Sequence, residues 1–157
     1  MADSTYGYLE NVTFSYNYAG SSAGALVLAS DSSADVYSCL FDSNSCGTNG
    51  GAMAIFNQGQ YLMKDTTFRN NTGKSGGAMY SSDSTFQTII NSTFSQNIAS
   101  TRGGAIYSTS SAILNIINCM FDKNIAESAP GGGIVIQDSA FIDITDSTLT
   151  VSKLTLI

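Results

Sequence analysis

Apolar and polar positions recur along this chain in a fixed order, with a period of about 27 residues. Each repeat holds a phenylalanine and, three positions later, an asparagine, in the pattern F-x-x-N. The phenylalanine column comprises Phe14, Phe41, Phe68, Phe94 and Phe121, with Leu149 in a sixth copy. The asparagine column comprises Asn17, Asn44, Asn71, Asn97 and Asn124. A strict period of this length predicts a solenoid, because each repeat can bury its apolar face only against its neighbours.

A pair of glycines follows the asparagine of each repeat and marks a corner. The best copies read G-G-A-(I/M), and the weaker ones begin at Ala23 and Gly131. The second glycine of the pair is Gly51, Gly77, Gly104 and Gly132 in successive repeats. Paired glycines permit a positive φ or a close approach of two backbones, and the apolar residue after them opens a strand. The single-residue slips in the period fall between the asparagine and this corner, where we expect an outward loop to absorb them.

Two more columns predict a second apolar face and a turn. The apolar column lies five residues before the phenylalanine and comprises Leu9, Val36, Met63, Ile89, Ile116 and Ile144. The turn column comprises Asp3, Ser30, Asn57, Asp83, Ser110 and Asp138. These residue types favour turns because their side chains bond to the nearby backbone.

Together the columns predict an all-β fold, a right-handed parallel β-helix with three short strands and three turns per coil. The right hand is the usual one for connections between parallel strands. We expect about six coils, stacked ~4.8 Å apart, in a rod of roughly triangular section. Residues 1–157 then form a single domain, with the phenylalanine and asparagine columns in its interior. Stacked Asn side chains can bond to one another and to the backbone of a turn.

Composition shows that the polar surface carries few charges. Only 11% of the 157 residues are charged, and the chain instead has 24 Ser, 15 Thr and 12 Asn. Hydroxyl and amide side chains can stack in register without like-charge repulsion. The net charge is −6 and no basic cluster occurs, so no nucleic-acid partner is expected. No apolar stretch reaches about 18 residues, so no transmembrane helix is expected.

The pairing of F-x-x-N with G-G-A-(I/L) resembles the repeats of the chlamydial polymorphic outer-membrane proteins and of other large exported microbial surface proteins. With five copies of F-x-x-N, the resemblance covers nearly the whole chain. It implies a right-handed parallel β-helix of the broad pectin-lyase-like class. It also implies that this chain is the surface-exposed part of a longer exported protein and that the repeat region is associated with adhesion.

An enzyme is the main alternative, because the β-helix class includes polysaccharide lyases and hydrolases. Glycoside hydrolysis needs two nearby carboxylates, and lyases use Asp residues around calcium with an Arg or Lys base. Asp42 and Asp122 share a column three coils apart, a separation of roughly 14 Å. Asp143 and Asp146 are close in sequence, but no column of Arg or Lys accompanies them, and His is absent. We therefore expect no catalysis, no metal and no cofactor.

Cysteines and sequons give candidate modification sites. Cys39 and Cys119 share a column three coils apart, too far for a disulfide. Buried free thiols are the expected state, and a Cys39–Cys46 bridge is the alternative. The three N-x-S/T sequons, which are candidate N-glycosylation sites, lie at Asn11, Asn70 and Asn91. Asn11 and Asn91 share one column, which we expect to face solvent.

The sequence favours a structural or adhesive β-solenoid that is extracellular or exposed at the cell surface. The chain begins and ends in mid-coil, so either it is a segment of a longer β-helix or its copies stack end to end into a filament. The expected partners are flanking coils or further copies, and surface glycans or a host or neighbouring cell surface. The alternative is a carbohydrate-binding or polysaccharide-cleaving β-helix, which an outward column of aromatic residues would favour. Tyr80 and Tyr107 are the one hint of such a column, and we expect them to pack between coils or against a flanking loop.

Overall fold

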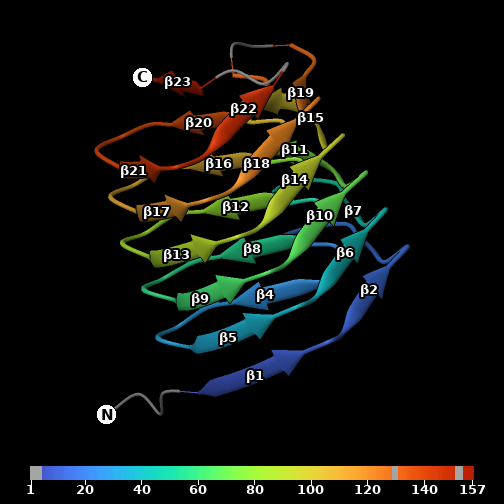
Figure 1. Ribbon diagram of the computed structural model, residues 1–157, viewed down its shortest axis with the longest axis vertical. Helices are drawn as coiled ribbons and strands as arrows, with labels where there is room; N and C mark the ends of the chain where they lie inside the picture. The colour runs from blue at the N-terminus through green and yellow to red at the C-terminus, as the bar shows by residue number, and fades with distance from the viewer. Residues whose placement is uncertain (1–4, 129–130, 151–153) are drawn as a thin grey trace.

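The chain winds through four short strands in each of its first five coils, and equivalent strands of successive coils pair in parallel (Figure 1). The computed structural model describes residues 5–128, 131–150 and 154–157. Each strand pairs with the strand one coil further along, so four parallel sheets, here named A to D, run along the solenoid. In this described part of the chain, no helix is long and apolar enough to span a membrane.

The strands of the four sheets have the following bounds. Sheet A comprises β1 (Tyr6–Glu10), β5 (Ser33–Tyr37), β9 (Gln60–Lys64), β13 (Phe86–Ile90), β17 (Ile113–Ile117) and β21 (Phe141–Thr145). Sheet B comprises β2 (Thr13–Ser15), β6 (Leu40–Asp42), β10 (Thr67–Arg69), β14 (Thr93–Ser95), β18 (Met120–Asp122) and β22 (Thr148–Thr150). Sheet C comprises β3 (Tyr18–Ala19), β7 (Ser45–Cys46), β11 (Thr72–Ser75), β15 (Ile98–Arg102) and β19 (Ile125–Ala126). Sheet D comprises β4 (Leu26–Leu28), β8 (Met53–Ile55), β12 (Met79–Ser81), β16 (Ile106–Ser108), β20 (Ile134–Ile136) and β23 (Leu154–Leu156).

The coil has four strands, so the prediction of three strands and three turns per coil was wrong. The additional sheet is C, which lies between the asparagine and the glycine corner. Its strands β3, β7 and β19 have two residues each, too few for an alternation of apolar and polar positions to stand out. The broader prediction is confirmed: the fold is an all-β parallel solenoid of about 27 residues per coil, with six strands in three of its sheets.

Residues with positive φ make the bends between the sheets. Between sheets A and B, one residue per coil has φ of 51–55°: Asn11, Ser38, Asp65, Asn91, Asn118 and Asp146. Between sheets B and C the equivalent residues are Tyr16, Ser43, Asn70, Gln96 and Lys123. Between sheets D and A two consecutive residues adopt positive φ, and the first of each pair is Ser30, Asn57, Asp83, Ser110 or Asp138. This confirms the predicted turn column, apart from Asp3, which lies outside the described residues.

Aromatic and aliphatic columns fill the interior as predicted. The rings of Phe41, Phe68, Phe94 and Phe121 are fully buried and stack with interplanar angles of 2° and centroid separations of 4.5–4.9 Å. Phe14 continues the stack, with its ring centroid 4.7 Å from that of Phe41. The second apolar column packs beside it, with Val36, Met63, Ile89 and Ile116 fully buried and Leu9 and Ile144 partly buried.

The glycine corner uses both properties that the sequence predicted for it. The first glycine of the pair has positive φ, from 61° at Gly103 to 98° at Gly131. The second glycine packs its Cα against the backbone of the next coil, so that a side chain on Gly77 would overlap the carbonyl of Gly104. One slip in the period is absorbed in sheet C, where the pairing of β11 with β15 shifts register between Gly73 and Ser75. This slip lies where predicted, as a strand irregularity and not as an outward loop. The slip before Gly131 falls partly on residues 129–130, outside the described residues.

Candidate functional site

The asparagine column forms a continuous ladder of hydrogen bonds inside the bend between sheets B and C. From Asn17 to Asn124, each Nδ2 donates to the Oδ1 of the next asparagine at 2.9–3.1 Å. Each backbone N–H donates to that same Oδ1, also at 2.9–3.1 Å. The second amide hydrogen bonds the phenylalanine carbonyl of the preceding coil, as from Asn97 to Phe68 at 3.1 Å. The ladder therefore pairs buried backbone groups that the bend removes from the sheets, which is a structural role.

A second ladder, which the sequence analysis missed, performs the same task at the bend between sheets A and B. Its column holds Cys39, Thr66, Ser92, Cys119 and Ser147. The N–H of each of the first four donates to the hydroxyl or thiol one coil on, at 2.9–3.4 Å. Each hydroxyl or thiol donates in turn to the carbonyl two residues before it. The three cysteines are all free and buried, as predicted, and the alternative Cys39–Cys46 bridge is not formed.

This ladder makes a prediction about Cys119, whose sulfur accepts the N–H of Ser92 at 3.4 Å. Cys119→Ser is expected to change the free energy of unfolding by less than about 1 kcal/mol, because a hydroxyl can replace the thiol as acceptor. Cys119→Val should cost about 1–3 kcal/mol, because the buried N–H of Ser92 is left without an acceptor. Urea unfolding of the two variants measures the difference. Equal midpoints would show that the thiol only fills space.

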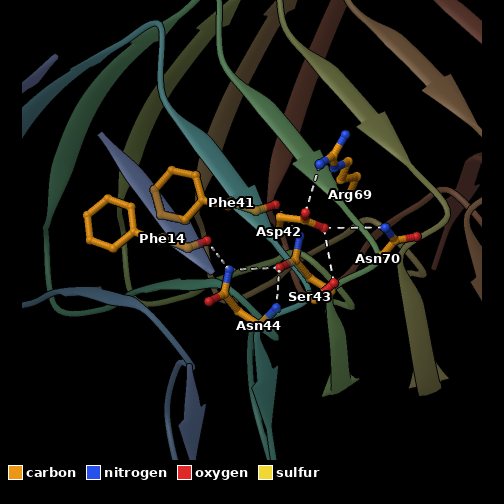
Figure 2. A network of polar contacts seen from close by, with 8 residues as sticks. Phe14, Phe41, Asp42, Ser43, Asn44, Arg69 and Asn70 are labelled. Carbon is orange, nitrogen blue, oxygen red and sulfur yellow. Dashed lines mark hydrogen bonds and ion pairs between the residues drawn. The ribbon is translucent and has the colours of Figure 1, made fainter. Parts of the chain in front are cut away.

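An ion pair between Asp42 and Arg69 connects two successive coils on the outside of the bend between sheets B and C (Figure 2). Asp42 accepts hydrogen bonds from Arg69 at 2.8 Å, from Ser43 at 3.0 Å and from the side chain of Asn70 at 3.3 Å. The hydrogen bond from Arg69 is the main reason that the pKa of Asp42 lies below its ordinary value, against a smaller opposing effect of desolvation. Asp42 is thus held as a paired carboxylate, which suits a structural contact better than acid catalysis.

The three sequons all lie on exposed bends. Asn11 and Asn91 belong to the column between sheets A and B, every member of which is exposed, as predicted. The side chain of Asn91 donates to Asp65 at 3.2 Å and accepts from Asn118 at 2.9 Å. Asn70 lies on the other bend, where its Nδ2 contacts Asp42. Glycosylation at these positions stays a prediction.

Among the described residues, the outward face of sheet A carries more exposed aromatic and aliphatic side chains than any other sheet. This surface, named the sheet A face, is formed by the first, third and fifth residues of each five-residue strand. Its exposed large apolar side chains are Tyr6, Tyr8, Phe86, Ile113, Ile117 and Phe141. Phe86, Ile113 and Phe141 follow one another in one outward column. Exposed apolar side chains grouped in this way mark binding sites more often than isolated apolar residues do. The sequence analysis missed this face because its columns mix aromatic, aliphatic and polar residues.

Tyrosines and acidic residues cluster at the N-terminal end of the sheet A face. Asp35 accepts hydrogen bonds from the hydroxyls of Tyr6 at 3.0 Å and Tyr37 at 3.5 Å. Tyr8 donates to Glu10 at 3.0 Å, and its ring lies 5.7 Å from that of Tyr37. The hydrogen bonds to Asp35 and Glu10 are the main reasons that the pKa values of Tyr6 and Tyr8 are raised. The hydrogen bonds therefore hold Tyr6 and Tyr8 in place, while both residues stay exposed.

A shallow depression of about 400 Å³ lies on the sheet A face. Its rim includes Tyr6 and Phe86, and the polar side chains of Asp35, Gln60 and Thr88 line it. Tyr6 and Phe86 stand in one outward column, three coils apart. The depression thus combines aromatic rings with hydrogen-bonding groups, which is the make-up of many ligand sites.

Tyr80 and Tyr107, the aromatic pair singled out in the sequence, are packed as predicted. Their ring centroids lie 5.6 Å apart, and the ring of Tyr80 also contacts Phe56 at 5.4 Å. Tyr107 is buried, and its hydroxyl bonds Gln137 and Arg102. The pair is therefore less open to a ligand than the sheet A face. Among the described residues, no group of three or more His, Cys, Asp and Glu side chains is placed to hold a metal ion.

Comparison with known proteins identifies the family from nearly the whole chain. The model of the family described as "Right handed beta helix region" matches residues 1–156. No curated protein and no solved structure matches the chain. The matched family agrees with the parallel sheets and the 27-residue register seen in the structure. The chain belongs to the right-handed β-helix family.

Proposed function

We propose that this chain is a non-enzymatic structural and adhesive β-solenoid, and that it attaches to its target through the sheet A face. The observation that carries the proposal is the set of exposed aromatic and aliphatic side chains on that one face, which lie on strand β1 and on the three neighbouring strands β13, β17 and β21. Rigid parallel sheets hold these side chains in fixed columns, so little conformational entropy is lost when they are covered. The rest of the rod then serves as a spacer.

The spacing of acidic residues supports a non-enzymatic role. Asp35 and Asp143 share an outward column of sheet A, but they stand four coils apart, roughly 19 Å. Glycosidases place their two carboxylates within about 10 Å of each other. Asp42 is neutralised by Arg69 in a structural pair. Glu10 and Asp35 lie on neighbouring strands, but both already accept hydrogen bonds from tyrosine hydroxyls. We therefore assign no general acid and base pair among these described carboxylates.

An extracellular or cell-surface location is part of the proposal. A surface of hydroxyl and amide groups with 11% charged residues, and three sequons on exposed bends, suit that environment. The resemblance to chlamydial polymorphic outer-membrane proteins adds adhesion as the role. Further copies of the chain are proposed partners, since parallel strands and ladders can be continued in register from one coil to the next. Filaments seen by electron microscopy, with an axial repeat of a whole number of coils, would test this.

Binding to a panel of surfaces tests the adhesive role. The panel consists of cellulose, xylan and chitin particles and of beads coated with collagen or fibronectin. We expect the native chain to bind at least one of them, and the triple variant Phe86→Ser, Ile113→Ser, Ile117→Ser to bind at least about tenfold less, because it loses three apolar contacts. The matched control is Tyr18→Ser with Ile125→Ser, which removes two exposed apolar side chains from sheet C.

Two outcomes would contradict the proposal. If the triple variant bound as well as the native chain, the sheet A face would not be the site of attachment. If reducing ends or unsaturated sugars were released from the polysaccharide particles, the chain would be an enzyme. Circular dichroism of each variant confirms that the fold is retained.

A further inference from the structure

We propose that Tyr8 and Tyr37, on the outward face of sheet A, are a site of oxidative cross-linking to dityrosine, with Glu10 and Asp35 as the proton acceptors. This modification goes beyond the proposed function, because it involves no target surface. Tyr8 lies on β1 and Tyr37 on β5, the neighbouring strand of the next coil. Their ring centroids are 5.7 Å apart and their planes are inclined by 45°, which is the geometry of rings in direct contact. A covalent bond between the rings would join two successive coils.

The hydroxyl of each of these tyrosines is hydrogen-bonded to a carboxylate. Tyr8 donates to Glu10 at 3.0 Å, and Tyr37 donates to Asp35 at 3.5 Å. The hydrogen bond to Glu10 raises the pKa of Tyr8, and partial desolvation together with the charge of Asp35 raises that of Tyr37. Both phenols therefore hold their protons at neutral pH, and a proton must leave each ring as its electron is removed. The two carboxylates are placed to accept these protons, as a general base does.

The oxidant that the reaction requires is hydrogen peroxide acting through a haem peroxidase. Each phenol gives one electron to the oxidised peroxidase and its hydroxyl proton to the bonded carboxylate, which leaves a tyrosyl radical. A ring carbon next to each hydroxyl-bearing carbon then joins its counterpart in a C–C bond, and the hydrogen atoms on these two carbons move to the phenol oxygens. In all, two electrons and two protons are removed, and they reduce one molecule of hydrogen peroxide to two of water.

A second pair of tyrosines has the same ring geometry in a different environment. The centroids of Tyr80 and Tyr107 are 5.6 Å apart and their planes are inclined by 46°. Tyr107 is buried, and its hydroxyl accepts a hydrogen bond from Arg102 at 3.4 Å and donates to Gln137 at 3.0 Å. A guanidinium opposes the loss of an electron from the ring, and an amide is a poor acceptor for the proton. Carboxylate partners and exposure to an oxidant thus select the pair on sheet A.

A cross-link at this place would fasten an outer strand of sheet A. Among the described strands, β1 pairs with β5 only, whereas β5 pairs with strands on both sides. Each coil of a solenoid is held only by its neighbours, so a strand that is paired on one side opens more easily. A covalent bond between β1 and β5 limits this opening and also restricts the unfolded chain, as a disulfide does. The cross-linked chain should therefore unfold at a higher urea concentration than the untreated chain.

Peroxidase treatment of the purified chain tests the proposal. The chain is treated at low concentration with hydrogen peroxide and a haem peroxidase, and the monomer is isolated by size exclusion. We expect dityrosine fluorescence in the monomer. A protease that cleaves after Asp31, between the two tyrosines, should release their peptides still joined and lighter by two hydrogen atoms, which mass spectrometry measures. Tyr8→Phe and Tyr37→Phe should each abolish the joined peptide, whereas Tyr18→Phe, which removes an exposed hydroxyl from sheet C, should leave its yield unchanged.

The double variant Glu10→Gln with Asp35→Asn separates the role of the carboxylates from the proximity of the rings. The amides keep the size and one acceptor oxygen of the carboxylates but cannot take up a proton at neutral pH, so the rate of dityrosine formation should fall several-fold. A native rate in this variant would overturn the assignment of the carboxylates.

Three further results would overturn the cross-linking site. They are a treated native monomer without the joined peptide, undiminished dityrosine fluorescence in the Tyr37→Phe monomer, and a cross-linked chain that unfolds at the same urea concentration as the untreated chain. Circular dichroism confirms that each variant keeps the fold. Because the experiment contains no target surface, its failure would leave the proposed adhesive role standing.

Discussion

Gly77→Ala is expected to lower the free energy of unfolding by at least about 4 kcal/mol, or to prevent folding altogether. Gly77 is the second glycine of its corner, and its Cα faces the next coil. A Cβ there would overlap the carbonyl oxygen of Gly104 and lie 2.6 Å from that of Ile98. Both oxygens belong to backbone, which cannot rotate away as a side chain can. The added methyl group must therefore separate two coils and break the hydrogen bonds between them, including that from Gly77 to Gly103.

Gly20→Ala is the matched control for this prediction. A Cβ on Gly20 would meet no heavy atom within 4 Å, and the residue does not have positive φ. We expect its effect on stability to stay within about 0.5 kcal/mol. The measurement is urea unfolding followed by far-ultraviolet circular dichroism. If Gly77→Ala unfolded at the same urea concentration as Gly20→Ala, close backbone packing would not explain the glycine column.

The sequence predicts those features of the fold in which one residue type recurs at one position. Phe41 and Asn44 stand in columns of identical residues, so their inward position and the parallel stacking follow from the period alone. The glycine corner is predictable for the same reason, since only glycine satisfies both a positive φ and a close backbone contact. Each of these positions strongly favours one residue type, so the same residue recurs from repeat to repeat and the column can be recognised in the sequence.

Features that tolerate several residue types escape the sequence pattern. The second ladder needs only a small side chain that can accept and donate a hydrogen bond, so Thr66, Ser92 and Cys119 serve equally well. Sheet C cannot be predicted from the sequence, because several of its strands have two residues, too few to show an alternation of apolar and polar positions. The sheet A face cannot be predicted from the repeat, because outward side chains need no common size or polarity to maintain the fold. Its aromatic residues become a candidate site only when the register places Tyr6 and Phe86 in one column.

Asn97→Ala is expected to lower the free energy of unfolding by about 4 kcal/mol, because it interrupts the asparagine ladder in the middle of the solenoid. The substitution removes the acceptor for the backbone N–H and for one amide hydrogen of Asn71. It also removes the donor to the carbonyl of Phe68 and one donor to Asn124. Each buried polar group left unpaired costs about 1–3 kcal/mol, and at least two of these are backbone groups that cannot move to water. Asn115→Ala, at an outward position of β17, is the control and should cost less than about 1 kcal/mol.

Asn97→Asp separates the hydrogen-bonding role of Asn97 from its volume. Aspartate keeps the oxygen that accepts from Asn71, but as a carboxylate it cannot donate to Phe68 or Asn124. Burial beside two acceptor oxygens should raise the pKa of the new carboxyl above its value of about 4 in the unfolded chain. For an acid with a raised pKa in the folded state, stability increases as the pH falls through that pKa, since protonation relieves the buried charge and restores one donor. We therefore expect the difference in urea midpoint between Asn97→Asp and the native chain to shrink as the pH falls from neutrality. A difference that does not depend on pH, or an Asn97→Ala variant as stable as Asn115→Ala, would show that the asparagine column does not stabilise the fold through its hydrogen bonds.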